Sequence, residues 1–446
     1  MEAMKPSYPP VPVAPGPPIV GHLPELRKNR VAFLERLRRE FGNTVAFRAG
    51  PVRAVLLAEP ADVRAALVER AYDFHKAPTY RFLKVMLGEG LLTSEGDLHR
   101  GQRRLLAPYF TPRRIRTFAD AIVACAEDTR WNEGQVVDVV EAMSALTLVA
   151  ANRSLFGDDI DTEAPGLSDS FLAFNRWVVE EAYRSIHLPV WLPLPRHAPL
   201  RKARRVVETE IGELIRRRRG REVPGEDMLS ALMGATFEEG GHMSDEQLRD
   251  EIFTLMFAGH ETTALALAWT FYLLARHPDE RLRLEREVDE VLGGRPPTVD
   301  DIERLSFTHR VLLESLRLYP PAPVIGRQAQ RDVELATCSV RRGTVVTCSI
   351  FSIHHRPDLH PEPDAFRPER FASNQPPSDG TYMPFGLGPR ICIGNHFAMM
   401  EAQLLLASLV QRYRLDLVDD APVAMTPLVT LHPARPVMAR VTPRVR

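Results

Sequence analysis

The chain has 446 residues, 44% hydrophobic and 26% charged, proportions that exclude a disordered or fibrous protein and allow a large core. Lysine and arginine number 57 and aspartate and glutamate 58, so the net charge of −1 gives no field that would attract nucleic acid or an anionic membrane. At about 150 residues per domain, the length predicts roughly three domains. The lack of a signal peptide, of an apolar run of about 18 residues and of CxxC spacings predicts a soluble cytoplasmic protein without disulfides.

The first elements are expected to be an extended segment and a helix. Residues 1–25 are rich in proline and lack periodicity, which predicts a semi-rigid lead-in rather than a domain. An apolar stripe of Phe33, Leu34 and Leu37 then predicts a helix over about 30–41.

Strands are expected in two places only. Two alternating stretches, 44–48 and 52–56, flank a Gly-Pro pair and predict a small hairpin. A second strand-rich region is expected over 333–350, and nearly everything between these regions has helical periodicity. The sequence therefore predicts a mainly α fold with a small β region.

The longest predicted helix runs from Ser244 to about His277 and spans on the order of 50 Å, so it must cross the core. Ser244 and Gln247 form a capping-box pattern at its start, and Pro278 follows its end. Its middle, 258–263, reads AGHETT. This sequence is unfavourable for the interior of a helix, because Gly costs about 1 kcal/mol relative to Ala and Thr hydroxyls compete for backbone carbonyls. Such a break in local rules indicates either a functional site or a packing glycine beside solvated polar residues.

A glycine-rich loop lies near the C-terminus, where residues 385–394 read FGLGPRICIG ahead of a helix-like stretch over 395–412. The glycines allow tight turns and close approach to a bound group. Cys392 lies just before the helix N-terminus, whose dipole and free N–H groups favour a metal-binding thiolate, whereas an isolated cysteine is more often a small buried hydrophobe. That core role is expected for the remaining cysteines, Cys125, Cys338 and Cys348.

Four motifs together resemble the cytochrome P450 superfamily of haem-thiolate monooxygenases. They are the cysteine loop with its FxxGxRxCxG pattern, the central-helix motif of 258–263, the ExxR motif that begins at Glu314, and the PERF segment of 366–371. The resemblance covers almost the whole chain and implies the mainly α fold of that superfamily, with haem b between the central helix and the cysteine-loop helix. It also implies one domain over 26–446 in place of three.

The resemblance implies roles for individual residues. Cys392 would be the axial thiolate ligand of the iron, and Glu261 and Thr262 would relay protons, aided by a local opening of the helix at Gly259. A buried network of Glu314, Arg317 and Arg370 would hold the cysteine loop in place. The implied cofactor-binding residues, whose cationic members would pair with the haem propionates, are His99, Arg103, Ala258, Gly259, Arg327, Phe385, Gly386, Arg390 and Gly394.

The substrate pocket is expected among mostly apolar side chains around the central helix. Their character favours a lipophile such as a terpenoid or fatty acid over a sugar or a nucleotide. The residues expected to line the pocket are Phe82, Val85, Met86, Leu87, Leu255, Thr263, Val324, Ile325 and Val429.

The expected reaction is insertion of one oxygen atom from O2 into that substrate, by a monomer that takes part in secondary metabolism, binds no nucleic acid and spans no membrane. A flavin domain would need a much longer chain, so electrons are expected from a ferredoxin with its ferredoxin reductase or from a flavodoxin. Arginines flanking the proximal helix would steer such a partner: Arg100, Arg104, Arg113 and Arg114. Two alternatives stay open: a haem-thiolate isomerase or dehydratase that needs no external electrons, and a non-catalytic haem-binding sensor. The Glu261-Thr262 pair disfavours both.

Overall fold

The computed structural model describes residues 10–157, 166–184, 186–220, 228–235 and 243–444. Its helices are α1 (Leu23–Phe41), α2 (Pro60–Arg64), α3 (Tyr80–Leu87), α4 (Gly96–Leu106), α5 (Pro112–Ile115), α6 (Ala119–Asp128), α7 (Val139–Phe156), α8 (Leu167–Ala182), α9 (Ala198–Arg219), α10 (Met228–Gly234), α11 (Asp245–Arg276), α12 (Pro278–Leu292), α13 (Ser306–Leu318), α14 (Ile350–His354) and α15 (Asn395–Arg412). Its strands are β1 (Thr44–Ala49), β2 (Val52–Leu57), β3 (Phe74–Lys76), β4 (Val136–Asp138), β5 (Val324–Ala329), β6 (Val333–Glu334), β7 (Ser339–Val340), β8 (Val345–Ser349), β9 (Tyr413–Leu417), β10 (Met425–Pro427), β11 (Leu431–Pro433) and β12 (Met438–Pro443). The predicted mainly α fold with a small β region is confirmed.

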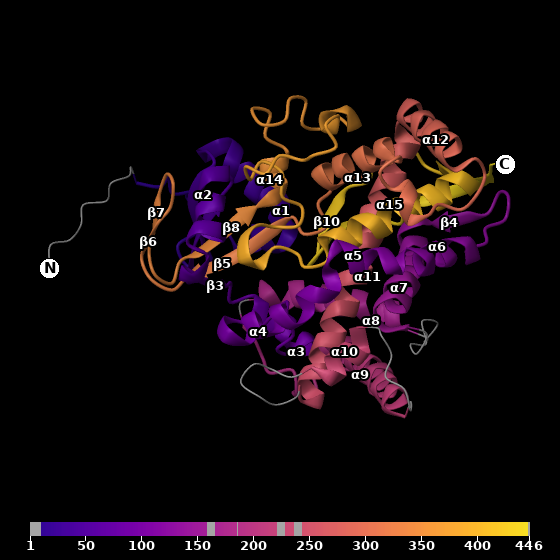
Figure 1. Cartoon of the computed structure of the whole chain (residues 1–446). Helices are drawn as coiled ribbons and strands as arrows, with labels where there is room; N and C mark the ends of the chain where they lie inside the picture. The colour runs from indigo at the N-terminus through magenta and orange to yellow at the C-terminus, as the bar shows by residue number, and fades with distance from the viewer. Residues whose placement is uncertain (1–9, 158–165, 185, 221–227, 236–242, 445–446) are drawn as a thin grey trace.

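The main sheet has the order β1-β2-β8-β5-β3 and lies with α1 and α2 at one side of the molecule (Figure 1). Most helices lie beside it, together with the smaller sheets β10-β11 and β4-β12-β9 (Figure 1). The predicted hairpin is confirmed, because β1 and β2 pair antiparallel. The second strand-rich region is confirmed but divided, since β6 and β7 form their own small hairpin and β8 joins the main sheet. The prediction missed β3, β4, β5 and the strands β9 to β12. The residues of β5 are mostly half-buried and show no clear alternation.

Helix α1 begins at Leu23, earlier than the sequence predicts and inside the expected lead-in. It contains a kink at Asn29, where φ is −163° and ψ is 98°. The Asn29 Oδ1 atom accepts from the Ala32 amide at 3.0 Å, as the cap of a new helix start does. The predicted helix over about 30–41 therefore corresponds to the second segment of α1.

Helix α11 crosses the core, as its length predicts, and packs against α7, α13 and α15. The Ser244 hydroxyl accepts a hydrogen bond from the Gln247 amide at 3.1 Å and so caps the N-terminus of α11. Among the described residues, α7 alone is long and apolar enough to cross a membrane, but 61% of it is buried and it lies against α11, as a core helix does.

The segment between α3 and α4 is held on α11 by two buried carboxylates. Asp250 accepts from the Glu89 amide at 2.8 Å and Glu251 accepts from the Leu91 amide at 3.0 Å. Gly88 has a φ of 51°, and a Cβ there would lie 1.8 Å from Asp250 Oδ2. This close approach fixes where α4 begins, and α4 in turn carries residues of the site described below.

The pKa of Glu251 makes this contact pH-dependent. Burial, with a smaller effect of Asp250, raises that pKa from 4.5 to about 7. Between these values the folded chain keeps a proton that the unfolded chain has released, so stability falls as pH rises from 4.5 to 7 and the loss persists above 7. This loss of folding free energy is at most about 3 kcal/mol.

We expect Glu251→Gln to remove this share of the pH dependence, because the amide oxygen still accepts from Leu91 and carries no charge. Thermal unfolding of the haem-loaded protein between about pH 5 and about pH 8 should show the variant gaining on the parent as pH rises. Exposed Glu303 provides the control, Glu303→Gln. Parallel pH profiles for Glu251→Gln and the parent would contradict the prediction. A residual slope is expected from Glu401, whose pKa burial raises to about 8.

Candidate active site

A cavity of about 570 Å³ lies between α11, the main sheet and the loop before α15. Residues from the central-helix motif, from the ExxR stretch and from the cysteine loop line it, whereas the PERF segment does not. The expected site residues that line it are His99, Arg103, Leu255, Ala258, Gly259, Thr262, Thr263, Val324, Ile325, Arg327, Phe385, Gly386, Arg390, Cys392, Gly394 and Val429. The structure thus gathers residues more than 290 positions apart around one space.

The cysteine loop is held in a tight conformation by its glycines. Gly388 has a φ of 73°, and a Cβ there would lie 2.0 Å from the Leu67 carbonyl oxygen, so no other residue fits without movement of the backbone. The Cys392 amide donates to the Phe385 carbonyl at 2.9 Å and closes the loop. The thiol consequently lies at the cavity wall, three residues before α15 begins at Asn395.

The Cys392 side chain is accessible, and the surface that it presents lines the internal cavity. Burial raises the pKa of its thiol, opposed by the Gly394 amide and by Arg103. The sequence predicts that the helix N-terminus favours a thiolate, but here the effect of burial is larger. A bound metal cation is the partner that would convert such a thiol to the thiolate, so the donor fits an iron ligand.

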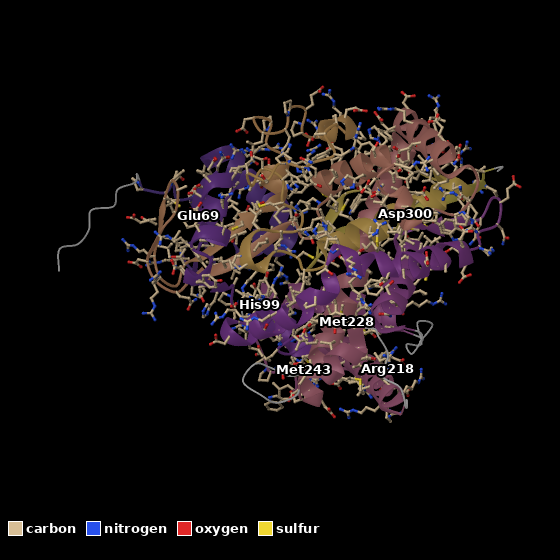
Figure 2. All side chains as sticks on the ribbon, in the orientation of Figure 1. Glu69, His99, Arg218, Met228, Met243 and Asp300 are labelled. Carbon is tan, nitrogen blue, oxygen red and sulfur yellow. The ribbon has the colours of Figure 1, made fainter. Side chains whose placement is uncertain are left out.

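Cationic side chains converge on one part of the cavity, close to the cysteine loop. Arg103 Nη1 donates to the Ile391 carbonyl at 2.7 Å, and Arg390 Nη1 donates to the Ser94 carbonyl at 3.1 Å. Burial and the surrounding cations lower the pKa of His99, which lies on α4 (Figure 2), to about 3. Glu95 pairs with Arg390, but the cations outnumber this carboxylate, and the excess positive charge suits an anionic ligand such as the two propionates of haem.

Lys76 belongs to the same group, although the sequence analysis did not single it out. Its Nζ donates to the Ser94 carbonyl at 2.6 Å, and burial together with Arg390 lowers its pKa to about 7. Lys76 on β3 lies directly opposite Arg327 on β5, and like charges at such a position are destabilising. The signal in the sequence is too weak to find it, because β3 is three residues long and β5 was not predicted.

The middle of α11 lines the cavity with small and polar residues. Thr262 Oγ1 donates to the Ala258 carbonyl at 2.8 Å, and Thr263 Oγ1 donates to the Gly259 carbonyl at 3.2 Å. The helix runs unbroken through Gly259, so the opening expected there is absent from this structure.

Glu261 does not line the cavity, contrary to what its pairing with Thr262 in the sequence suggests. Adjacent helical residues point in different directions, and the Glu261 carboxylate accepts from the Asn175 amide group. His432 Nε2 lies 2.9 Å from Glu261 Oε1 and 3.1 Å from Thr430 Oγ1, and Thr430 does line the cavity. Hydrogen bonds of His432 and Thr430 thus connect Glu261 to the cavity.

The expectation for α3 is wrong in detail. Phe82, Val85, Met86 and Leu87 do not line the cavity of the described residues; Tyr80 and Leu83 do. These two are three residues apart and share one face of α3. Phe82 instead packs against Trp177 with ring centroids 6.2 Å apart.

A buried ion pair supports the cysteine loop from behind. Glu314 and Arg317 have no solvent exposure and pair with an Nε to Oε2 distance of 2.7 Å. Arg370 Nε lies 3.1 Å from Glu314 Oε1, as the resemblance implies. Arg317 Nη1 also donates to the His354 carbonyl at 2.8 Å. The His354 ring accepts from the Met383 amide at 3.0 Å, which connects this pair to the segment just before the cysteine loop.

The comparisons with known proteins agree with this geometry. The family model described as Cytochrome P450 matches residues 9–439. Cyclooctatin synthase from Streptomyces melanosporofaciens is 37% identical over 94% of this chain and 93% of its own length. Pentalenene oxygenase from Streptomyces avermitilis is 32% identical over 97% of each chain. The solved structure of a retinoic acid-bound cyanobacterial protein named CYP120A1 is 25% identical, with a TM-score of 0.86 over 98% of this chain and 100% of that one.

The chain therefore belongs to the cytochrome P450 family, whose members carry a haem-thiolate cofactor. Within that family it is a monooxygenase.

We expect Glu314→Ala to leave Arg317 as an unpaired buried charge, at a cost of about 3–5 kcal/mol. The ferrous–CO spectrum and the ratio of haem to protein should show loss of the haem-loaded form. Glu303→Ala, at an exposed position, should leave both unchanged. A stable, fully haem-loaded Glu314→Ala protein would show that the pair is dispensable.

We expect Lys76→Met to affect the haem-loaded and haem-free proteins in opposite directions. Without haem, the variant loses a buried like-charge contact with Arg327 and should unfold at a higher temperature. With haem, it loses a cation near the propionates, and haem should transfer to excess apomyoglobin about tenfold faster or more. Lys28→Met, at an exposed position, is the control. Unchanged haem transfer would show that Lys76 does not face the propionates.

Proposed function

We propose that this P450 binds haem b through Cys392 and hydroxylates a terpenoid, using O2 and electrons from a separate redox protein. The observation that carries the proposal is one cavity that combines an accessible thiol, a group of buried cations and a mostly apolar wall. Apolar walls with a few placed polar groups are typical of sites for lipophilic small molecules.

The propionates would be held by His99, Arg103, Arg327 and Arg390, with Lys76 added from the structure. Cys392 would supply the thiolate ligand of the iron, and Gly386 and Gly394 would leave room for the cofactor. When bound, haem supplies the iron centre at which dioxygen is activated, and the thiolate favours O–O cleavage.

Proton delivery would involve Thr262, the hydroxyl of α11 that borders the cavity. Glu261 would contribute indirectly, through His432 and Thr430, which lines the same cavity as Thr262. A hydroxyl that faces the substrate and exchanges protons with solvent can act as a general acid. The Thr263 hydroxyl, bonded to Gly259, would contribute to the pocket wall.

The relatives narrow the substrate class. Two of them are named for cyclooctatin synthesis and pentalenene oxygenation, and the solved structure holds retinoic acid. These names support a terpenoid over a fatty acid for this chain. The pocket would be completed by Leu255, Val324, Ile325 and Val429, together with Tyr80 and Leu83.

The redox partner would dock beside the cysteine loop. Helix α4 contacts that loop through Arg103 and Ile391, and its outer surface carries exposed Arg100 and Arg104. Arg113 on α5 is exposed nearby in sequence, and Arg114 is partly exposed. An acidic ferredoxin or flavodoxin would be steered by such charges. A cytoplasmic monomer is the form in which we propose that the enzyme works.

The test begins with the ferrous–CO spectrum of the purified haem protein. We expect the red-shifted band of a thiolate ligand, lost in Cys392→Ser and kept in Cys125→Ser, which changes a buried cysteine away from the cavity. Turnover of terpenoids is then measured with a ferredoxin, its reductase and NADPH. Product formed without O2 and electrons would favour the isomerase, and a normal spectrum without any turnover would favour the sensor.

In the same assay we expect Thr262→Ala to consume O2 and NADPH but to form less product per NADPH consumed, because the variant lacks the hydroxyl that borders the cavity. Thr270→Ala, also on α11 and buried away from the cavity, is the matched control. The yield of product per NADPH is the measurement, and an unchanged yield in Thr262→Ala would exclude this role.

A further inference from the structure

Arg30 is a buried arginine that lines the cavity. It is 9% exposed and lies directly after the kink at Asn29, at the start of the second segment of α1. Its Nη2 donates to the Leu428 carbonyl and, at 3.3 Å, to the Val429 carbonyl. The guanidinium is thus fixed between α1 and the C-terminal loop that carries Val429.

No carboxylate of the described residues lies within ion-pair distance of Arg30, although its charge is removed from water. Both carbonyl contacts leave from Nη2, and the guanidinium also hydrogen-bonds the Tyr183 side chain; its five N–H groups exceed these partners. Burying a cation without an anionic partner is unfavourable, and carbonyl groups compensate for it only in part. The position therefore suits a ligand that brings the missing negative charge.

Two phenol groups accompany the guanidinium. Tyr80 of α3 and Tyr183, directly after α8, line the same cavity and are close enough to act electrostatically on Arg30. Among the described residues, no hydrogen bond or ion pair joins Arg30 to the cations that would hold the propionates, although Tyr80 acts electrostatically on both Arg30 and Arg390. A guanidinium and two hydroxyls provide convergent donors, which is the arrangement that a carboxylate needs.

We propose that Arg30, with Tyr183 and Tyr80, binds the carboxylate of the lipophilic substrate, so that the physiological substrate is an isoprenoid acid. The inference rests on the proposed function, because it assigns the polar end of a ligand whose apolar body lies in the same cavity. Terpenoid and straight-chain acids share this chemistry, and the experiment below separates them.

The test compares matched acids and alcohols on the haem-loaded protein, with binding measured by the shift in haem spin state and by calorimetry. The probes are retinoic acid with retinol and palmitic acid with 1-hexadecanol. We expect each acid to bind more tightly than its alcohol, and the isoprenoid pair more tightly than the straight-chain pair. Equal affinity for an acid and its alcohol would overturn the proposal. Tighter binding of the palmitic acid pair than of the retinoic acid pair would show that the substrate is a straight-chain acid and not an isoprenoid acid.

The variants locate the effect. Arg30→Met should weaken binding of retinoic acid about 10- to 100-fold and leave retinol unchanged, and Tyr183→Phe should weaken the acid about 3- to 10-fold. Arg27→Met makes the same change at an exposed position of α1 and should behave like the parent. If Arg30→Met does not fold, Arg30→Lys, which keeps the charge and loses the planar fork, should still weaken the acid selectively. Retained preference for the acid in these variants would overturn the proposal.

Two further results are distinguishable. If Arg30→Met loses haem while thermal unfolding of the haem-free chain is unchanged, Arg30 is a propionate partner and the carboxylate site is refuted. If retinol and hexadecanol bind and are hydroxylated but the acids are not bound, the inference fails and the proposed function stands. If none of the four probes binds to a protein with a normal ferrous–CO spectrum, both fail.

Discussion

Glu314 and Arg317 are both fully buried, and a charge pair removed from water so completely is stable only if its remaining donors and acceptors are matched. The rest of the pair's neighbourhood is arranged to meet this condition. The five N–H groups of Arg317 find acceptors on Glu314 and on the carbonyls of His354, Pro363 and Ala365. The long irregular segment before the cysteine loop is thereby ordered around one buried guanidinium. This ordered segment in turn fixes the position of the cysteine loop.

The cavity contains charge of one sign in a surrounding that is mainly apolar. Lys76 and Arg327 face each other across two strands, and burial lowers the pKa of Lys76 to about 7. Such an arrangement is unfavourable in the protein without its cofactor. Binding of an anionic cofactor relieves the repulsion between these cations, and this relief contributes to the binding free energy. Stability and cofactor affinity are therefore opposed at these positions, and a substitution that improves one is expected to weaken the other.

The sequence predicted what depends on local pattern and on motifs. The bounds of α11 and α15 agree within two residues, since a cap, a terminal proline and a glycine loop mark them. It missed β5 and Lys76, because the neighbours that give these residues their place lie far along the chain. The orientation of Glu261 was also out of reach, since it is set by Asn175 and His432 on other elements. The pocket residues expected at 82 and 85–87 lie on α3, but the face of this helix that lines the cavity is the one with Tyr80 and Leu83.

The proline-rich lead-in has a consequence for the sheet. Strand β1 is an edge strand, and the segment before α1 pairs with it through Val13 opposite Ala46 and Gly21 opposite Ala49. Exposed edges of this kind present unpaired N–H and C=O groups that recruit strands from other molecules. Because proline cannot extend a strand ladder, the lead-in covers the edge without offering a new one. It thus acts as a built-in guard against self-association through the sheet.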